Sequence, residues 1–215
     1  DTTEEKKEKK EVKQPGDDLV LFEINSGDTL LFPNVTDYSY AKDGASVCFV
    51  QQRKDTVNTY SDVSVFDTTA GEEKELFSSE GWADKVTSDE SGQKYAFLFS
   101  QDTIDEKVYS MYYGTVASSP EKTVDSYTSG IPVGWSPSEN GPLYFSEDGT
   151  KLYLGTAESP EPEPEDTLLA EEKPKFDVWS WHDKKLQPEQ KVELDREKKR
   201  TYLAVYHINL NRFIQ

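Results

Sequence analysis

The chain has 215 residues, a formal net charge of −18 and a hydrophobic fraction of 34%, with aromatic residues making up 12%. The negative charge argues against nucleic acid and anionic membrane surfaces as partners, because binding to phosphates depends on lysine and arginine. No run reaches the about 18 apolar residues of a membrane-spanning helix, no apolar signal-peptide region opens the sequence, and the single cysteine excludes an internal disulfide. The wealth of aromatic side chains instead favours β-sheet.

The first part of the chain predicts a flexible segment followed by a hairpin. Residues 1–16 mix acidic and basic side chains and end at Pro15-Gly16. Mixed charges with so few apolar positions predict a solvated, flexible segment and not a basic binding arm. In residues 17–32, an apolar run leads into a polar turn at Gly27-Asp28 and a second apolar run returns. We interpret this as the outer hairpin of a partial unit that lacks its two inner strands.

Two units of four strands follow, at residues 33–77 and 78–124. Alternation of side chains across Tyr109–Tyr113 argues for strand and not helix. The polar stretch Lys54–Tyr60, between the second and third strands of the first unit, could meet a ligand, although such loops are more often only connections. The eight expected strands lie at 35–40, 46–53, 62–67, 74–77, 83–87, 94–100, 107–115 and 122–124.

The last unit, residues 125–215, contains an insertion. It begins near Trp135 and continues into paired strands around Asp148-Gly149. Residues 158–175 are rich in proline and glutamate, which cannot hold a strand ladder, so we predict an inserted mobile loop there.

Beyond this loop, Phe176–Trp181 is predicted to resume as a strand. Residues 186–200 have too few regularly spaced apolar positions for a packed helix, which leaves a short exposed helix or an irregular excursion. The final residues, 202–214, are predicted to form a closing hairpin.

The turns between these strands repeat at a nearly fixed interval. Gly44, Gly92 and Gly141 each end a polar run just before a strand, and they are spaced 48 and 49 residues apart. Glycine tolerates the positive φ that a tight turn demands. A period of this length, with strands between the turns, is typical of β-propellers.

The predicted fold class is therefore all-β: a partial β-propeller of about three to four four-stranded antiparallel blades. The blades are expected at 17–32 (partial), 33–77, 78–124 and 125–215, the last with the inserted loop. Closed propellers usually have about four to eight blades. Either copies of the chain or residues outside it would supply the remaining blades.

A search for catalytic chemistry in the chain finds no convincing centre. No Gly-x-Ser-x-Gly window is present, because the stretch around Ser136 lacks the second glycine. Neither His182 nor His207 has a partner at metal-ligand spacing, so a surface or packing role is favoured for each. Cys48 lies in an apolar strand and is expected to be a buried thiol.

Three weaker readings remain from the residue types. Two of the 42 acidic residues could form a glycosidase pair, but nothing in the sequence selects two of them. Turns such as Asp43-Gly44 lack the closely spaced oxygen ligands of a calcium loop, and turn chemistry explains them. Trp179 and Trp181 could stack on a sugar or peptide, but filling space between blades is the favoured role.

Several segments resemble the propeller of bacterial prolyl oligopeptidase-like serine peptidases. The resemblance is carried by FDVWSWHD (176–183), LQPEQ (186–190) and RTYLAVY (200–206). The turns at Tyr40–Gly44 and Phe145–Gly149 are similar to the repeat of those propellers and of TolB. Together the similarities cover about residues 17–215.

The resemblance implies a parent enzyme in which the propeller precedes an α/β-hydrolase domain, covers the active site and admits only peptide-sized substrates. The catalytic serine, aspartate and histidine would lie in that hydrolase domain, and none maps onto this chain. The glutamate pair of dipeptidyl peptidases also has no counterpart. The chain itself is thus expected to be non-catalytic, with no catalytic, cofactor-binding or metal-binding residues.

The partners expected from the resemblance are the missing blades, the hydrolase domain and a peptide substrate, with no nucleic acid and no membrane. A bacterial periplasmic or secreted location is suggested. A free-standing TolB-like binding propeller or scaffold is the main alternative, and a propeller glycosidase fragment is a third.

Overall fold

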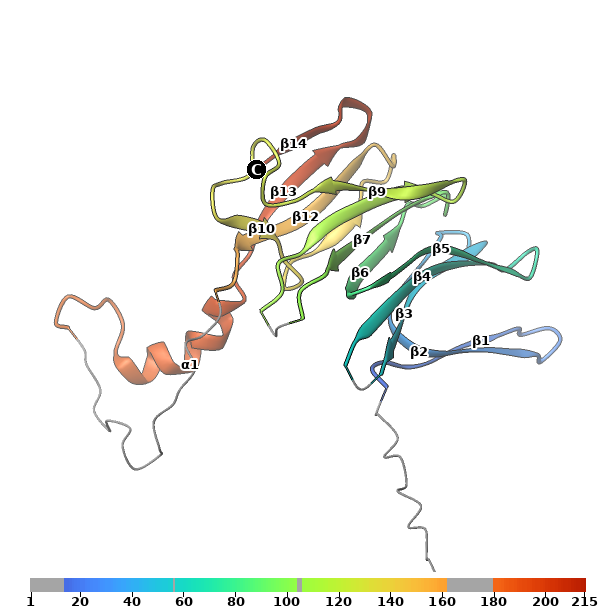
Figure 1. Cartoon of the computed structure of the whole chain (residues 1–215), viewed down its shortest axis with the longest axis horizontal. Helices are drawn as coiled ribbons and strands as arrows, with labels where there is room; N and C mark the ends of the chain where they lie inside the picture. The colour runs from blue at the N-terminus through green and yellow to red at the C-terminus, as the bar shows by residue number, and fades with distance from the viewer. Residues whose placement is uncertain (1–13, 56, 104–105, 162–179) are drawn as a thin grey trace, which may run out of the picture.

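The computed structural model describes residues 14–55, 57–103, 106–161 and 180–215, and this part of the chain forms three antiparallel sheets that lie side by side in chain order (Figure 1). The all-β fold expected from the sequence is confirmed. Sheet 1 contains β1 (Asp17–Phe22), β2 (Thr29–Tyr40), β3 (Ser46–Lys54), β4 (Thr59–Asp67) and β5 (Glu72–Glu80). Sheet 2 contains β6 (Trp82–Ser88), β7 (Lys94–Ser100), β8 (Ser110–Thr115) and β9 (Ser118–Val124).

Sheet 3 contains β10 (Trp135–Pro137), β11 (Leu143–Phe145), β12 (Lys151–Glu158), β13 (Tyr202–His207) and β14 (Arg212–Ile214). Its inner strand is split, because β10 and β11 both pair with β12 on the same side. At the split, the Ser138 amide donates to the Gly155 carbonyl over 3.0 Å, and the Gly155 amide donates to the Pro142 carbonyl over 2.8 Å. Gly141 lies against Gly155 backbone to backbone, where a Cβ on either residue would clash. Sheet 3 is therefore a four-stranded unit with a bulged inner strand.

The turns that precede β3, β7 and β12 are equivalent, and they correct one prediction. In each, the backbone closes by a hydrogen bond of 2.9–3.0 Å: Ala41 to Ser46, Asp89 to Lys94 and Ser146 to Lys151. The glycines with positive φ in these turns are Gly44, Gly92 and Gly149, at 74°, 67° and 59°. The prediction of Gly141 as the third member was wrong, since Gly141 lies in the bulge and its φ is not positive.

This equivalence defines two faces on every sheet. Face A carries Val47 and Phe49 in sheet 1, Tyr95 and Phe97 in sheet 2, and Leu152 and Leu154 in sheet 3. Face B carries the alternating residues Cys48 and Val50, Ala96 and Leu98, and Tyr153 and Gly155. Face B of sheet 1 packs on face A of sheet 2, and face B of sheet 2 packs on face A of sheet 3. The same face order at both junctions is the packing of successive propeller blades.

The hairpin at residues 17–32 continues the hydrogen-bonded ladder of sheet 1 and also packs against one face of that sheet. Its ladder is continuous with sheet 1, because Thr29–Tyr40 is a single strand, so the expected separate partial blade is not a separate sheet. Yet β2 bends at Asn34, whose φ is 56°. The Phe32 ring lies 4.7 Å from that of Phe49 and 5.4 Å from that of Phe66.

The β-ladder explains what this bend does. The pairing of β2 with β3 begins at Val35 and Gln51, near the C-terminal end of β3. Phe66 pairs with Val47, which lies near the N-terminal end of β3. Phe32 can reach both phenylalanine rings only if the hairpin folds back across face A of sheet 1. Leu19 and Leu21 join the same cluster. In its packing the hairpin thus occupies the place of the outer half of a preceding blade.

The remaining expectations concern the ends of the chain and the insertion. Residues 1–13 lie outside the described residues, but Gln14 is fixed by two hydrogen bonds to the backbone of Lys54, at 2.9 and 2.8 Å, so the expected flexible segment does not extend to residue 16. The inserted loop from 162 onward and Phe176–Trp179 also lie outside the described residues. Ser180 and Trp181 do not continue a strand.

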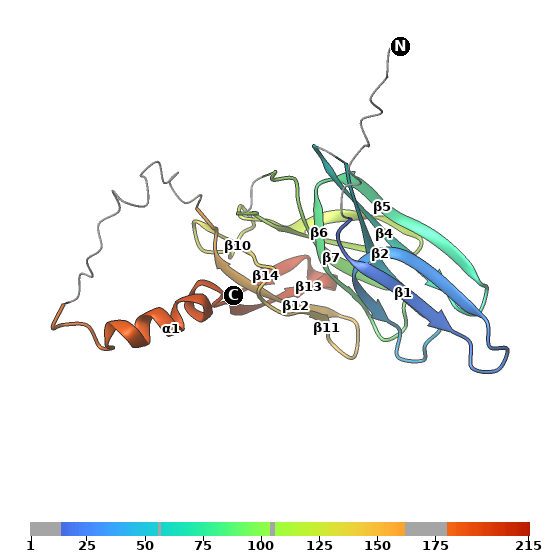
Figure 2. The same cartoon turned by 90° about the horizontal axis from the view of Figure 1, so that it is seen from below.

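The helix α1 (Gln187–Lys198) is the short exposed helix that the sequence left open, and it stands away from the sheets (Figure 1 and Figure 2). It buries none of its residues. Among the described residues, no helix has the length and apolar character needed to cross a membrane.

Candidate functional site: the loop face

The two ends of the stacked sheets differ in their connections. At one end, here called the turn face, lie the short turns 41–45, 68–71, 89–93, 116–117, 146–150 and 208–211. At the other, the loop face, lie the described parts of the longer connections: 55 and 57–58, 101–103 and 106–109, 125–134, and the ends of the connection between β12 and β13 at 159–161 and 199–201. Antiparallel pairing places these two sets at opposite ends of the strands.

The turn face carries hydrogen bonds and an ion pair between neighbouring sheets. The Lys42 ammonium pairs with the Glu90 carboxylate at 2.7 Å, and the Lys42 amide donates to the Glu90 carbonyl at 3.0 Å. The Lys94 ammonium donates to the Gly149 carbonyl at 2.7 Å. Binding sites are more often built from longer connections than from such short turns, so the loop face is the place to look for one.

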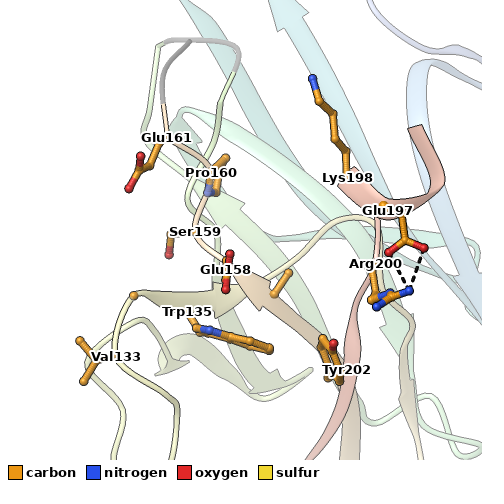
Figure 3. Close-up of a pocket in the computed structure, with 12 residues that line it drawn as sticks. Val133, Trp135, Glu158, Ser159, Pro160, Glu161, Glu197, Lys198, Arg200 and Tyr202 are labelled. Atoms are coloured by element: carbon orange, nitrogen blue, oxygen red, sulfur yellow. Dashed lines mark hydrogen bonds and ion pairs between the residues drawn. The ribbon is translucent and has the colours of Figure 1, made fainter. Parts of the chain in front are cut away.

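One hollow on the loop face has a volume of about 710 Å³ (Figure 3). Its floor is an aromatic pair, Trp135 of β10 and Tyr202 of β13, with ring centroids 5.1 Å apart and an interplanar angle of 49°. Trp135 is placed by its pairing with Glu158 at the end of β12, and Tyr202 by its pairing with Thr156. The floor is therefore built on regular strands, although the rim comes from connections.

The rim of this hollow is charged and mostly acidic. Glu158, Glu161 and Glu197 line it together with Lys198 and Arg200. The Arg200 guanidinium pairs with the Glu197 carboxylate at 2.6 Å, as Figure 3 shows. A hydrogen bond with Tyr202 and the charge of Glu197 raise the pKa of Arg200, which stays positive. An aromatic floor with three carboxylates and two cations on its rim is suited to a ligand with both apolar and polar parts.

A second hollow of about 660 Å³ adjoins the first and shares Val133, Gly134 and Ser159 with it. It follows the connection 125–134 between sheets 2 and 3. Two apolar side chains in this connection are almost fully exposed, Val133 at 100% and Tyr127 at 92%. Together the hollows make an extended depression across the loop face.

Two half-buried acids on the inner strands, Asp37 of β2 and Asp84 of β6, were not selected by the sequence. Burial raises the pKa of both carboxyl groups, and the nearby charge of Asp84 adds to the rise at Asp37. Backbone amides of Tyr38 and Val86 donate to Asp37, which thereby links β2 to β6. No sequence signal distinguishes these acids from the other carboxylates. Asp37 acts as a tie between adjacent sheets, whereas Asp84 accepts a hydrogen bond from the neighbouring Lys85 amide at 2.7 Å.

The sequence-predicted residues are not brought together. Cys48 is buried at 2% exposure, as predicted, and burial raises the pKa of its thiol to about 12. Ser136 is buried in β10. His182 is exposed and stacks beside Trp181, whereas His207 ends β13 opposite Arg212. Within the described ranges, no group of three or more histidine, cysteine or acidic side chains could hold a metal ion.

Two smaller predictions have different outcomes. Asp43 accepts a hydrogen bond from the Ala45 amide at 2.9 Å, which is the turn chemistry expected of it. Trp181 is 86% exposed, so the prediction that it fills space between blades was wrong. Trp179 lies outside the described residues.

Comparison with known proteins finds similarity in structure only. No protein-family model matches the sequence, and no curated protein matches it. TolB from Acinetobacter baumannii is 13% identical, with a TM-score of 0.45 over 91% of this chain and 36% of that one. The β-propeller domain of the Trilobed protease from Pyrococcus furiosus is 12% identical, with a TM-score of 0.44 over 64% of this chain and 40% of that one.

A structure from a study of two prolyl endopeptidases is 18% identical, with a TM-score of 0.40 over 62% of this chain and 22% of that one. The chain thus spans less than half the length of these structures. TolB and prolyl-specific peptidases, the proteins that the sequence resembles, are both among its structural neighbours. At such identities and scores the likeness carries no argument about activity, and the assignment of a partial propeller rests on the three sheets themselves.

Proposed function

We propose that the chain is the non-catalytic propeller segment of a serine peptidase, and that its loop face meets the α/β-hydrolase domain and limits access to peptide-sized substrates. The sequence resemblance over 176–206 supports the kind of enzyme. The observation that carries the proposal is the depression on the loop face, with the exposed side chains of Val133 and Tyr127 beside it.

The size and chemistry of the depression suit this role. Its larger hollow, of about 710 Å³, falls within the roughly 300–1,000 Å³ of sites that hold small ligands. The aromatic pair Trp135 and Tyr202 offers apolar area, and the rim carboxylates offer hydrogen-bond acceptors to peptide amides. An extended peptide could lie there, whereas the hollow is too small to hold a folded domain.

The proposal assigns the chemical step to the hydrolase domain. In the described residues, the buried Ser136 and the buried Cys48 are not placed to act as nucleophiles. The contribution of this chain would be selection: it would orient a peptide and exclude larger chains, and such positioning lowers the entropic part of the barrier.

The test uses the whole protein that contains this chain and a series of fluorogenic peptides of increasing length. Tyr127→Glu places a charge on the loop face, and the control Leu210→Glu places the same charge on the turn face, where Leu210 is 69% exposed. We expect Tyr127→Glu to change kcat/KM several-fold and to alter the dependence on peptide length. Leu210→Glu should leave both unchanged.

Two outcomes would count against the proposal. If the whole protein hydrolyses no peptide, the peptidase assignment fails, and a stable protein partner would then favour a free-standing TolB-like binding propeller. If it hydrolyses peptides but both variants behave as the wild type, the loop face is not the gate. The 215-residue chain by itself should hydrolyse no peptide.

A further inference from the structure

Face B of sheet 3 is an apolar sheet face with no covering layer among the described residues. Its side chains come from β11, β12, β13 and β14, and Tyr144 and Tyr153 stack on it with ring centroids 5.0 Å apart. Leu203 is 56% exposed, Tyr144 43% and Ile214 40%. Burying such side chains is favourable, so a face of this kind is unusual on a free surface.

The equivalent positions in the other two sheets are the centres of junctions. Leu203 pairs with Gly155, as Met111 pairs with Leu98 and Val63 with Val50. Met111 and Val63 are both fully buried, at 0% exposure. The same strand position is therefore buried wherever a following sheet is present, and it is open only in sheet 3.

We infer that face B of sheet 3 is a docking surface for face A of one more antiparallel sheet of the same kind. The face order repeats twice within the chain, so the required partner is a sheet whose inner strand presents large apolar residues at every second position, as β7 does with Tyr95, Phe97 and Phe99 in sheet 2. The surface continues an interface that the chain already uses at two junctions. The inference rests on the proposed function in one respect: both require a longer protein, which here supplies the additional sheet.

A second copy of the chain is disfavoured as the occupant. Each copy carries a formal net charge of −18, and like charges of this size oppose close association. In a head-to-tail pair, the second copy would present its hairpin at residues 17–32 to face B, and this hairpin lacks the two inner strands of a complete sheet. Its exposed side, with Phe22 at 61% and Leu31 at 59%, is narrower than a complete face A.

The test uses the reactivity of a single introduced thiol. Cys48 is buried and its thiol pKa is about 12, so the native cysteine gives little background labelling. Leu203→Cys places a probe on face B, and Leu210→Cys places a matched probe on the turn face of the same sheet. Each variant is labelled with a maleimide in the 215-residue chain and in the whole protein.

We expect the Leu203→Cys variant to react freely in the 215-residue chain and about tenfold or more slowly in the whole protein, because labelling would then require local opening. The Leu210→Cys variant should react equally in both. Equal reactivity of the Leu203→Cys variant in both forms would overturn the inference. Protection in the 215-residue chain that grows with concentration would also overturn it, in favour of a second copy.

The outcome is separable from that of the proposed function. A protected face B in a protein that hydrolyses no peptide would leave the docking surface standing and remove the peptidase. An open face B in a protein that hydrolyses peptides would do the reverse.

Discussion

The contrast between Met111 and Leu203 provides the sharpest test of how the sheets are held together. The two residues occupy equivalent positions on the third strands of sheets 2 and 3, yet Met111 is fully buried and Leu203 is 56% exposed. Met111 packs in the cluster that joins the two sheets. We therefore expect Met111→Ala and Leu203→Ala to have very different effects on the stability of the chain.

The expected magnitudes follow from burial. Truncating a fully buried methionine to alanine costs about 2–5 kcal/mol in free energy of unfolding, from lost transfer energy and the cavity left behind. Fully burying a leucine contributes about 1.5–3 kcal/mol, so the roughly half that Leu203 buries leaves about 1 kcal/mol or less to lose. With an m-value of about 2–3 kcal/mol per molar urea, Met111→Ala should lower the midpoint by about 1–2 M and Leu203→Ala by less than about 0.5 M.

The assay is urea unfolding of the 215-residue chain, followed by circular dichroism and by tryptophan fluorescence. Coincident transitions and an unchanged m-value are needed before midpoints can be converted to free energies. Equal losses for the two variants, or a loss below about 1 kcal/mol for Met111→Ala, would refute the packing order of the faces.

Three further predictions address single residues. Cys48 should resist alkylation at pH 8 until the chain is unfolded, as intact mass would show, because burial raises the pKa of its thiol to about 12. Burial raises the pKa of Asp37 above its unfolded value of 3.8, so the ionised carboxylate lowers the stability of the folded chain at neutral pH. Asp37→Asn should therefore stabilise the chain at pH 7. This gain should disappear as the pH falls through the raised pKa to below 3.8, as urea midpoints would show. Gly155→Ala should lower the melting temperature more than Gly71→Ala, because a Cβ at residue 155 would clash with the Gly141 backbone. A Cβ at residue 71 has no neighbour within 4 Å, so the cost there comes only from the positive φ of 70°.

Much of the fold could be predicted because local and tertiary signals agree. In β3 and β7 the apolar positions are buried on both faces, and the turns before them contain glycines that need positive φ. For such strands, the position predicted from the sequence agrees with the position in the structure. The eight strands expected in residues 33–124 are all present. Strands β2, β4, β5 and β9 are longer than expected, whereas β8 begins at Ser110 and not at residue 107.

Two of the misassigned features, the third repeat turn and the hairpin at residues 17–32, have a common physical origin, which is backbone geometry that side-chain patterns do not encode. Gly141 and Gly149 both follow polar runs before apolar residues, and only φ and the closing hydrogen bond of Ser146 with Lys151 identify the second as the repeat turn. The bend at Asn34 likewise has no apolar signature. It nevertheless decides whether residues 17–32 extend sheet 1 or fold back over it.

The candidate site was the least predictable part, because the loop face is assembled from connections far apart in the sequence. Trp135 and Tyr202 are 67 residues apart and meet only because β10 and β13 both pair with β12. Neither aromatic residue was singled out, since an isolated tryptophan or tyrosine at a strand end is common in any propeller.

The arrangement of faces links the stability of the chain to its proposed role. A sheet that is hydrophobic on both faces requires a neighbour on each side, and sheet 2 is the one among the described sheets with a complete sheet against both faces. Sheet 1 has half a layer on face A, from Leu19, Leu21 and Phe32, and sheet 3 has none on face B. The side chains of the loop face are therefore supported in part by sheets 1 and 3, and each of these sheets lacks a complete neighbour on its outer face. Covering face B of sheet 3 should stiffen β13, and through Tyr202 it should fix the aromatic floor of the hollow. A gate of this kind would reach full selectivity only when the neighbouring sheet is docked.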